Sequence, residues 1–272
     1  MFKSIAVVSG KGGVGKSTLT AGIASALAWN GSRVLILDAD IGLRSQDALL
    51  SLENRIVYDL IDLADGECLP EQAILPSEDY PSLFLLPASQ FARAKNLDSK
   101  KLKKIIRSLS SEYDYCLIDC PSGIERGLRN VLNAGLDEIL LVVTPDDIAV
   151  RDAERTIQVI EAKSLPRPEL IVNRLEPDLI RSGDMMSANV IAALLDINLI
   201  GEVPEDPAVR FAVLKKNMLL HYDCEARNAV IRIASRLAGK TVPFPSYGHE
   251  KPSWLERFRP RKMKEVIPID DH

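Results

Sequence analysis

A glycine-rich segment close to the start of the chain carries the residues best suited to bind phosphate. Its sequence is Gly10-Lys11-Gly12-Gly13-Val14-Gly15-Lys16-Ser17-Thr18. The segment has the spacing G-x-x-x-x-G-K-[ST] of a phosphate-binding loop and lies between an apolar run and a helical pattern, which argues against a chance match. Glycines allow backbone N–H groups to turn toward phosphate oxygens, and the positive end of the following helix adds to the attraction. We therefore expect Lys16 to contact the β- and γ-phosphates of ATP and the Ser17 hydroxyl to coordinate Mg²⁺.

Carboxylates stand at the ends of two apolar runs. Asp38 and Asp40 follow the run at 34–37, and Asp119 follows the run at 115–118. The carboxyl ends of buried parallel strands form the edge at which open α/β sheets bind ligands. We expect Asp40 to orient or polarise the attacking water, Asp38 to lie in the outer shell of Mg²⁺, and Asp119 to support the metal ion as the acidic residue of a Walker B strand. One such aspartate is weak evidence, but two strand ends beside a phosphate-binding loop support each other.

Two further polar segments follow apolar runs in the second half of the chain. Asn173 and Arg174 follow one run, and Pro204 and Glu205 follow the next. Both segments belong to the same ligand-binding edge of a parallel sheet. Glu205 and Asp206 can also form the start of a helix, where the helix dipole stabilises negative charge, and the two roles are compatible.

Short apolar runs alternate with longer segments of helical period along most of the chain. The runs lie at 5–8, 34–37, 83–86, 115–118, 139–143, 170–172 and 199–203. The helical patterns lie at 16–30, 99–109, 147–163, 187–195, 206–216 and 225–237. Runs that are apolar throughout are typical of strands buried on both faces. The alternation predicts an α/β fold, a doubly wound and mostly parallel sheet with helices on both faces. A rise in proline content after residue 238 predicts one folded domain at 1–238, which contains the phosphate-binding loop, and a flexible tail at 239–272.

Composition excludes several classes of protein. The 272 residues include 34 Lys and Arg against 38 Asp and Glu, a formal net charge of −4. Such a chain does not bind nucleic acid over most of its surface, because phosphate backbones attract basic faces. Cys68, Cys116, Cys120 and Cys224 form no CxxC pair and no Cys/His cluster, so we expect buried cysteines without a bound metal. The chain has no run of about 18 apolar residues, which predicts a cytoplasmic protein without a membrane-spanning helix.

The second lysine of the loop, Lys11, is not needed for phosphate binding. With it, the loop resembles the deviant Walker A motif of the MinD/ParA family of P-loop ATPases. The resemblance implies a SIMIBI-class P-loop NTPase fold, an ATP-dependent homodimer, and a Lys11 that reaches across the dimer to the phosphates held by the other subunit. The alternative for Lys11 is a solvated loop lysine. The resemblance also implies adenine contacts from four residues: Asn173, Arg174, Pro204 and Glu205.

Six further segments resemble the MinD group of this family, in order and spacing, across residues 2–237. They are 38–47, 55–60, 87–90, 121–125, 149–153 and 181–185. The resemblance implies an ATPase that visits the cytoplasmic face of the inner membrane and regulates the position of the division septum. It also implies a MinC-like division inhibitor and a MinE-like activator as partners. Given the acidic net charge, we expect no direct contact with nucleic acid.

Such an ATPase needs a lipid-binding segment, and the end of the chain contains a candidate. Trp254, Leu255 and Phe258 would share one face of a helix. Ser253 and Glu256 have the spacing of a capping box, which marks a helix start. A short helix here would therefore carry three bulky apolar side chains on one face.

Basic residues surround this apolar face. Residues 250–264 carry six basic and two acidic side chains, among them Arg257 and Arg259, for a local net charge of +4. We expect the segment at about 252–263 to bind an anionic membrane as an amphipathic helix. Pro260 limits that helix to about two turns, so one copy should bind weakly and two copies on a dimer more strongly. The alternatives are a disordered basic tail or a helix docked on its own domain.

Four other classes of P-loop protein remain as alternatives. A ParA-type ATPase that moves DNA would carry its basic residues on the folded surface, whereas this chain gathers them in the tail. A flagellar-number regulator shares the loop and the tail and differs in its partners. An iron–sulfur carrier ATPase requires bridging cysteine pairs, and the sequence has no CxxC. A metabolic P-loop ligase requires a substrate pocket, for which the sequence offers no candidate residues.

Overall fold

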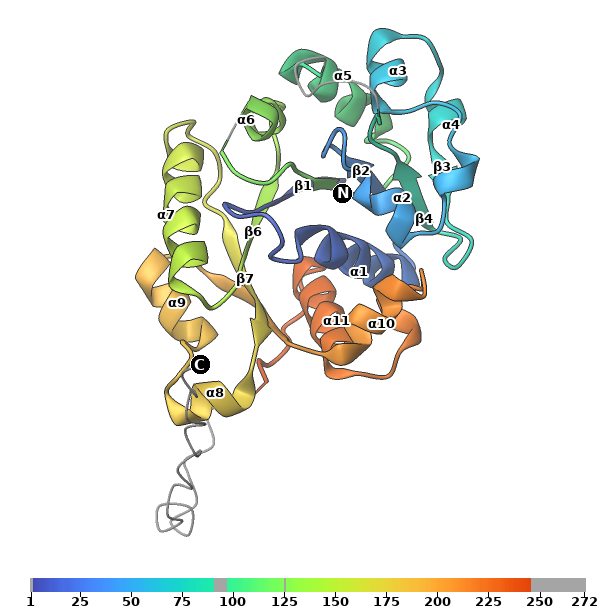
Figure 1. Ribbon diagram of the computed structural model, residues 1–272. Coiled ribbons are helices and arrows are strands. Elements are labelled where there is room, and N and C mark those ends of the chain that lie inside the picture. The colour runs from blue at the N-terminus through green and yellow to red at the C-terminus, as the bar shows by residue number, and fades with distance from the viewer. Residues whose placement is uncertain (1, 91–96, 125, 246–272) are drawn as a thin grey trace, which may run out of the picture.

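One mixed sheet forms the centre of the protein (Figure 1). The computed structural model describes residues 2–90, 97–124 and 126–245. In these ranges the sheet has eight strands in the order β3-β4-β2-β5-β1-β6-β7-β8, and all neighbours are parallel except β3 and β4. The strands are β1 (Lys3–Val8), β2 (Val34–Asp38), β3 (Leu75–Pro76), β4 (Leu83–Leu86), β5 (Tyr115–Asp119), β6 (Glu138–Val143), β7 (Glu169–Leu175) and β8 (Leu199–Pro204). The predicted doubly wound, mostly parallel sheet is confirmed.

Helices connect the parallel strands. They are α1 (Lys16–Trp29), α2 (Ser45–Leu49), α3 (Leu60–Asp65), α4 (Pro70–Ala73), α5 (Ser99–Leu109), α6 (Arg126–Leu132), α7 (Asp147–Glu161), α8 (Pro177–Ser182), α9 (Ala188–Leu195), α10 (Pro207–Leu214) and α11 (Glu225–Leu237). Two short 3₁₀ helices, η1 (Glu53–Arg55) and η3 (Leu219–His221), complete the set for the described residues. All of the helices predicted from the sequence are present, with ends that differ by at most two residues. Strand β3 and helices α2, α3, α4, α6 and α8 were not predicted, because segments of two to seven residues show no clear period.

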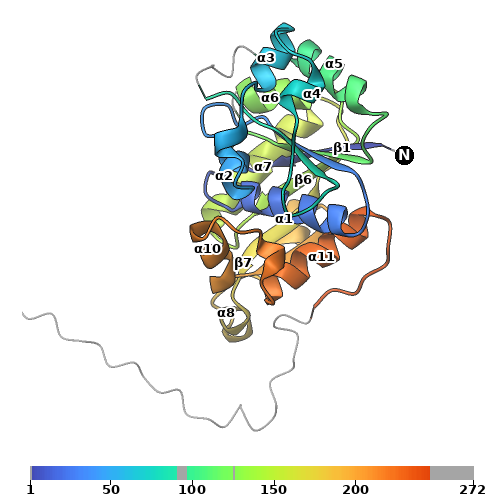
Figure 2. The same cartoon turned by 90° about the vertical axis from the view of Figure 1, so that its right-hand side faces the viewer.

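The sheet separates two apolar layers. Successive side chains of a strand point to opposite faces, so Ile5 and Val7 pack on one side and Ala6 and Val8 on the other. Helices α1 and α11 cover the first face, and α3, α5, α6, α7 and α9 cover the second (Figures 1 and 2). Helix α1 is buried nearly all round between the sheet and α11. Its small residues allow this, since a Cβ on Gly22 would already lie 3.3 Å from Val230 of α11.

The strand order places one site at the centre of the sheet. Strand β1 lies between β5 and β6, and the chain runs from it first to β2 on one side and later to β6 on the other. Such a reversal of direction leaves a crevice at the carboxyl ends of the strands, where α/β proteins bind ligands. The glycine-rich segment follows β1 directly and therefore lies at this crevice.

The last helix, α11, ends at Leu237, and residues 239–245 continue without a helix or strand. Within the ranges that the structure covers, no helix is long and apolar enough to cross a bilayer. The amphipathic segment predicted at 252–263 lies outside the described residues.

The contact between β8 and α11 predicts the effect of a small substitution. A Cβ on Gly201 would lie 2.5 Å from both Cγ1 and Cδ1 of Ile233, a fully buried side chain. We expect Gly201→Ala to lower the free energy of unfolding by about 1–3 kcal/mol through overpacking, measured by urea denaturation.

The control is a double-mutant cycle with Ile233→Ala, which removes both clashing atoms. The cost of the double variant should be smaller than the sum of the two single costs. Additive costs would show that the two residues do not compete for the same space.

Candidate nucleotide site

The glycine-rich loop ends in a bare helix N-terminus. Gly13 and Gly15 have φ angles of 79° and 93°, a left-handed conformation that other residues rarely adopt. Helix α1 begins directly after Gly15, and no side chain caps its first N–H groups. Backbone donors at an uncapped N-terminus, together with the helix dipole, favour the binding of an anion. The loop therefore has the form of a phosphate cradle.

Neighbouring elements hold the loop closely. A Cβ on Gly10 would collide with the backbone of Asp152 in α7, and one on Gly15 would collide with the side-chain amide of Asn173. That amide donates a hydrogen bond of 2.8 Å to the carbonyl of Val14. The loop is thus fixed between β7 and α7, and only glycine fits at the two contact positions.

Lys16 is a buried cation with a carboxylate partner. Its Nζ lies 2.5 Å from Oδ1 of Asp119 and 4.0 Å from Oδ2 of Asp40, and the residue is only 6% exposed. Burial by itself would lower the lysine pKa, but the charge and hydrogen bond of Asp119, with the charge of Asp40, raise it above its usual value. Lys16 therefore keeps a positive charge in a place where phosphate oxygens could replace the carboxylates.

Gln46 joins the same cluster, although its sequence context predicted no role for it. Its Nε2 donates to Oδ2 of Asp119 at 2.7 Å and to the carbonyl of Ser17 at 3.0 Å. Within the described residues, its Oε1 and the Ser9 hydroxyl are buried without a partner. Unpartnered buried polar atoms are rare and mark places where a ligand or water completes the hydrogen bonding. The sequence signals were the position of this glutamine shortly after the strand that ends in Asp38 and its place within the segment 38–47, which resembles the MinD group.

Asp38 shapes the segment that follows β2. Its Oδ1 accepts a hydrogen bond of 3.0 Å from the Asp40 N–H, and its Oδ2 accepts one of 3.1 Å from the Gln46 N–H. Burial, and then the negative charge of Asp119, raise the pKa of this carboxyl to about 8. Because both oxygens already bind backbone donors, the geometry is compatible with an outer-shell position for Asp38.

The oxygen atoms at the site suit Mg²⁺ held together with a nucleotide. The Ser17 hydroxyl and the carboxylates of Asp38, Asp40 and Asp119 are hard oxygen ligands of the kind that Mg²⁺ prefers. The described residues contain no cluster of three or more His, Cys, Asp or Glu that could hold a metal ion alone. Mg²⁺ usually takes one or two protein ligands and completes its shell with phosphate oxygens and water, so the donor set fits.

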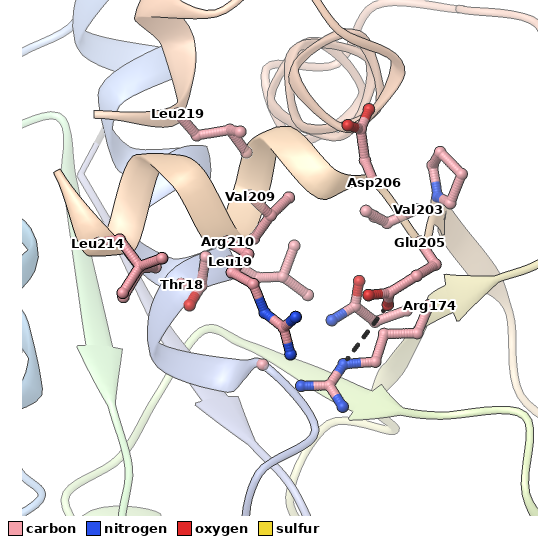
Figure 3. Close-up of a pocket in the computed structure, with 14 residues that line it drawn as sticks. Thr18, Leu19, Arg174, Val203, Glu205, Asp206, Val209, Arg210, Leu214 and Leu219 are labelled. Carbon is pink, nitrogen blue, oxygen red and sulfur yellow. Dashed lines mark ion pairs between the residues drawn. The ribbon is translucent and has the colours of Figure 1, made fainter. Parts of the chain in front are cut away.

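A pocket of about 320 Å³ opens beside the loop (Figure 3). The strand ends contribute Asn173, Arg174, Pro204 and Glu205, which are the four residues predicted to contact adenine. Arg174 lies 3.8 Å from Glu205 at the rim, and its φ of 62° is unusual for a residue other than glycine. The structure thus brings these four residues together, and their contact with a base stays a prediction.

Helix α10 forms the opposite wall of this pocket. The helix was predicted from the sequence, but its contribution to the pocket was not. Its lining residues are Val209, Arg210, Val213 and Leu214. They recur at helical spacing within the segment predicted to be helical, so the periodicity could have shown that they share one face. Mostly apolar walls with a few charged groups are typical of a pocket for a small molecule or cofactor.

Lys11 has its partner within its own chain. Its Nζ lies 3.3 Å from Oδ1 of Asp146, the residue that caps the N-terminus of α7. Both side chains are more than two-fifths exposed, and such pairs contribute about 0–1 kcal/mol. The predicted contact of Lys11 across a dimer stays a prediction, and the pair with Asp146 is weak enough to be exchanged.

Comparison with known sequences identifies relatives along nearly the whole chain. A model of the ParA family, described as NUBPL iron-transfer P-loop NTPase, matches residues 1–238. The septum site-determining protein MinD of a Synechocystis species is 40% identical over 265 residues, which cover 97% of this chain and 99% of that protein. The MinD protein of Bacillus subtilis is 39% identical over 246 residues, which cover 89% and 91%.

Solved structures give the same result. A chain of the MinC:MinD cell division protein complex of Aquifex aeolicus superposes with a TM-score of 0.82 at 38% identity, over 90% of this chain and 99% of that one. The septum site-determining protein MinD of Pyrococcus horikoshii, complexed with Mg-ADP, has a TM-score of 0.78 at 28% identity, over 87% and 96%. The present sequence has no CxxC pair.

The raised pKa of Asp38 predicts how stability depends on pH without nucleotide or Mg²⁺. The folded carboxyl has a pKa of about 8, against about 3.9 in an unfolded chain. The folded state therefore binds this proton more tightly, and the free energy of unfolding should fall as the pH rises from about 4 to about 8. Urea unfolding at several pH values should show a flatter profile for Asp38→Asn.

The slope is the readout, because the asparagine amide would face the Gln46 N–H and change the absolute stability. Asp79→Asn, at an exposed position, serves as the control and should keep the slope of the unchanged protein. Equal slopes for all three proteins would contradict the assignment to Asp38.

Proposed function

The chain belongs to the MinD group of the ParA family of P-loop NTPases, and from this membership we propose that it is a MinD-like ATPase that regulates the position of the division septum. The observation that supports this most is the site itself, a phosphate-binding loop with two lysines, Lys11 and Lys16, beside a pocket large enough for a base. Relatives named as septum site-determining proteins match nearly the full chain. A related chain occurs in a MinC:MinD complex, which supports a MinC-like division inhibitor as a partner.

Each residue of the site has a separate role in the proposed binding and hydrolysis of ATP. Lys16 and the N-terminus of α1 hold the phosphates, and the pocket between β7, β8 and α10 holds the base. Bound Mg²⁺ would neutralise charge on the β- and γ-phosphates. Ser17 would bind the metal directly, with Asp38 and Asp119 supporting it. Asp40, whose Oδ2 lies 4.0 Å from the Lys16 Nζ, would orient the attacking water.

Dimerisation completes this site. Lys11 exchanges its weak contact with Asp146 for the phosphates bound by the second subunit, which adds a positive charge where negative charge develops during phosphoryl transfer. A single chain lacks that charge, so turnover should be slow until a dimer and an activator of the MinE type are present. Two nucleotides at one interface therefore couple the ATP state to the oligomeric state.

The dimer is also the form that binds the membrane. Each tail carries a short basic and aromatic segment, whose predicted length gives weak lipid binding alone. Two tails on one dimer raise the effective concentration of the second after the first has bound. ATP thus places the protein at the cytoplasmic face of the inner membrane, and hydrolysis releases it.

Vesicle sedimentation tests this cycle. The full chain with Mg²⁺ and ATP should sediment with vesicles of phosphatidylglycerol and phosphatidylcholine, and with ADP it should stay largely in the supernatant. A chain truncated before Lys251 should stay in the supernatant in both cases, because it lacks the basic aromatic segment. Equal sedimentation with ATP and ADP, or of the full and truncated chains, would refute nucleotide-controlled membrane binding.

Two substitutions test the role of Lys11. Lys11→Ala should abolish most ATPase turnover measured with vesicles and a MinE-like activator, while a fluorescent ATP analogue still binds, because Lys16 and the loop remain. Asp146→Asn removes the charge partner within the chain and keeps an oxygen that can cap α7, so it should retain turnover. Turnover that survives Lys11→Ala would eliminate the role across the dimer.

A further inference from the structure

The chain turns sharply after α11 and returns toward the sheet. Gly239 has a φ of 80°, its N–H bonds to the carbonyl of Arg236 at 2.8 Å, and the Lys240 N–H bonds to the carbonyl of Ser235 at 3.0 Å. These two bonds form a Schellman motif, which ends a helix and reverses the chain. The residues that follow therefore run back along the last turn of α11 instead of leaving from its end.

One side chain fastens this returning segment. Arg236 donates from Nε to the carbonyl of Val242 at 3.1 Å and from Nη2 to the carbonyl of Pro243 at 3.0 Å. Its guanidinium also lies 3.8 Å from the centre of the Phe244 ring, which adds a cation–π contact. Residues 242–244 thus bind the domain through backbone carbonyls and one aromatic ring.

The third nitrogen of the same guanidinium reaches the sheet. Nη1 of Arg236 donates to the carbonyl of Ile200 at 2.8 Å. Ile200 lies at a register shift of the edge strand β8, between Leu199, which pairs with Leu170, and Gly201, which pairs with Ile171. Arg236 therefore joins three segments, namely α11, β8 and residues 242–244. A lysine could not do this, because it lacks the planar fork of donors.

This junction is remote from the nucleotide site. Ile200 lies near the amino end of β8, whereas the phosphate-binding loop lies at the carboxyl ends of the strands. Figure 2 shows the segment after α11 on the same side of the molecule as the N-terminus of the chain. The contacts of Arg236 thus serve neither the phosphates nor the base.

We infer that Arg236 is a positioning residue for the C-terminal tail: it clamps residues 242–244 to β8, so that the chain leaves the domain toward the predicted lipid-binding segment at Pro245 and not at Gly239. The clamp rests on the contacts described above, and its consequence for membrane binding rests on the proposed function. With the clamp, six residues (246–251) precede the predicted lipid-binding segment, and without it thirteen (239–251) do.

The length of the tether, meaning the residues between the domain and the lipid-binding segment, determines how much a second tail raises the affinity of the dimer for a membrane. Once a tether is long enough to span the two sites, the effective concentration of the second site falls roughly as the −3/2 power of tether length, and we take the six-residue tether to have reached that length. Doubling the tether therefore lowers the affinity of the dimer for vesicles by about threefold. The affinity for nucleotide should not change, because the clamp does not touch that site.

Two variants of the full chain separate the clamp from charge. Arg236→Lys keeps the positive charge but removes the planar fork of guanidinium donors. In sedimentation with phosphatidylglycerol vesicles, Mg²⁺ and ATP, its affinity for the vesicles should therefore be about threefold lower. Lys240→Ala removes a positive charge at an exposed neighbouring position that makes none of these contacts, so it should sediment like the unchanged protein. Binding of a fluorescent ATP analogue shows that each variant is folded.

Limited trypsin digestion reports the clamp without any membrane. Arg236→Lys should be cut faster after Lys240 than the unchanged protein, as followed by mass spectrometry, and Phe244→Ala should behave in the same way with α11 untouched. Unchanged cleavage in both variants would overturn the clamp, even if the unchanged protein failed to bind vesicles and the proposed function itself had to be abandoned. Two outcomes would overturn the positioning role. One is faster cleavage of Arg236→Lys with unchanged binding to vesicles, and the other is a loss of vesicle binding in Lys240→Ala equal to that in Arg236→Lys.

Discussion

A buried ion pair joins the phosphate-binding loop to the middle of the sheet. Lys16 opens α1, and Asp119 ends β5, so their contact at 2.5 Å ties the loop to a strand beside β1. Loss of one partner would leave the other charge buried without its main ionic partner, which is destabilising. Gln46 brings α2 to the same carboxylate. Three segments of the candidate site, namely α1 with its loop, α2 and the end of β5, are therefore held together by the carboxylate of Asp119.

The two apolar layers supply the stability that this site does not. Arg174 has a left-handed backbone, Asp38 has a raised pKa, and Ser9 has a buried hydroxyl without a partner among the described residues. Features of this kind cost free energy and cluster at binding sites. They lie at or next to the carboxyl ends of β1, β2 and β7, strands whose side chains are mostly buried. A nucleotide would supply the missing charges and hydrogen-bond partners.

Much of the fold and of the site could be predicted from local patterns. The apolar runs located the strands because parallel strands are buried on both faces, and the loop spacing located Lys16 and Ser17 because phosphate binding requires that geometry. The role of Gln46 could not be predicted, since its contact with Asp119 joins residues 73 positions apart. The same holds for the α10 wall of the pocket, because helical spacing shows which residues share a face and not what that face meets.

The sequence by itself determined the strand and helix order, the phosphate-binding loop, the family, and the acidic domain with its basic tail, because each is written in short-range spacing and composition. Only the tertiary structure decided which charges meet. It paired Lys11 with Asp146 and Lys16 with Asp119, and it brought Arg236 into hydrogen-bond contact with both β8 and residues 242–243. Pairs of this kind depend on sheet order and on chain reversals, which bring together residues that no local pattern relates.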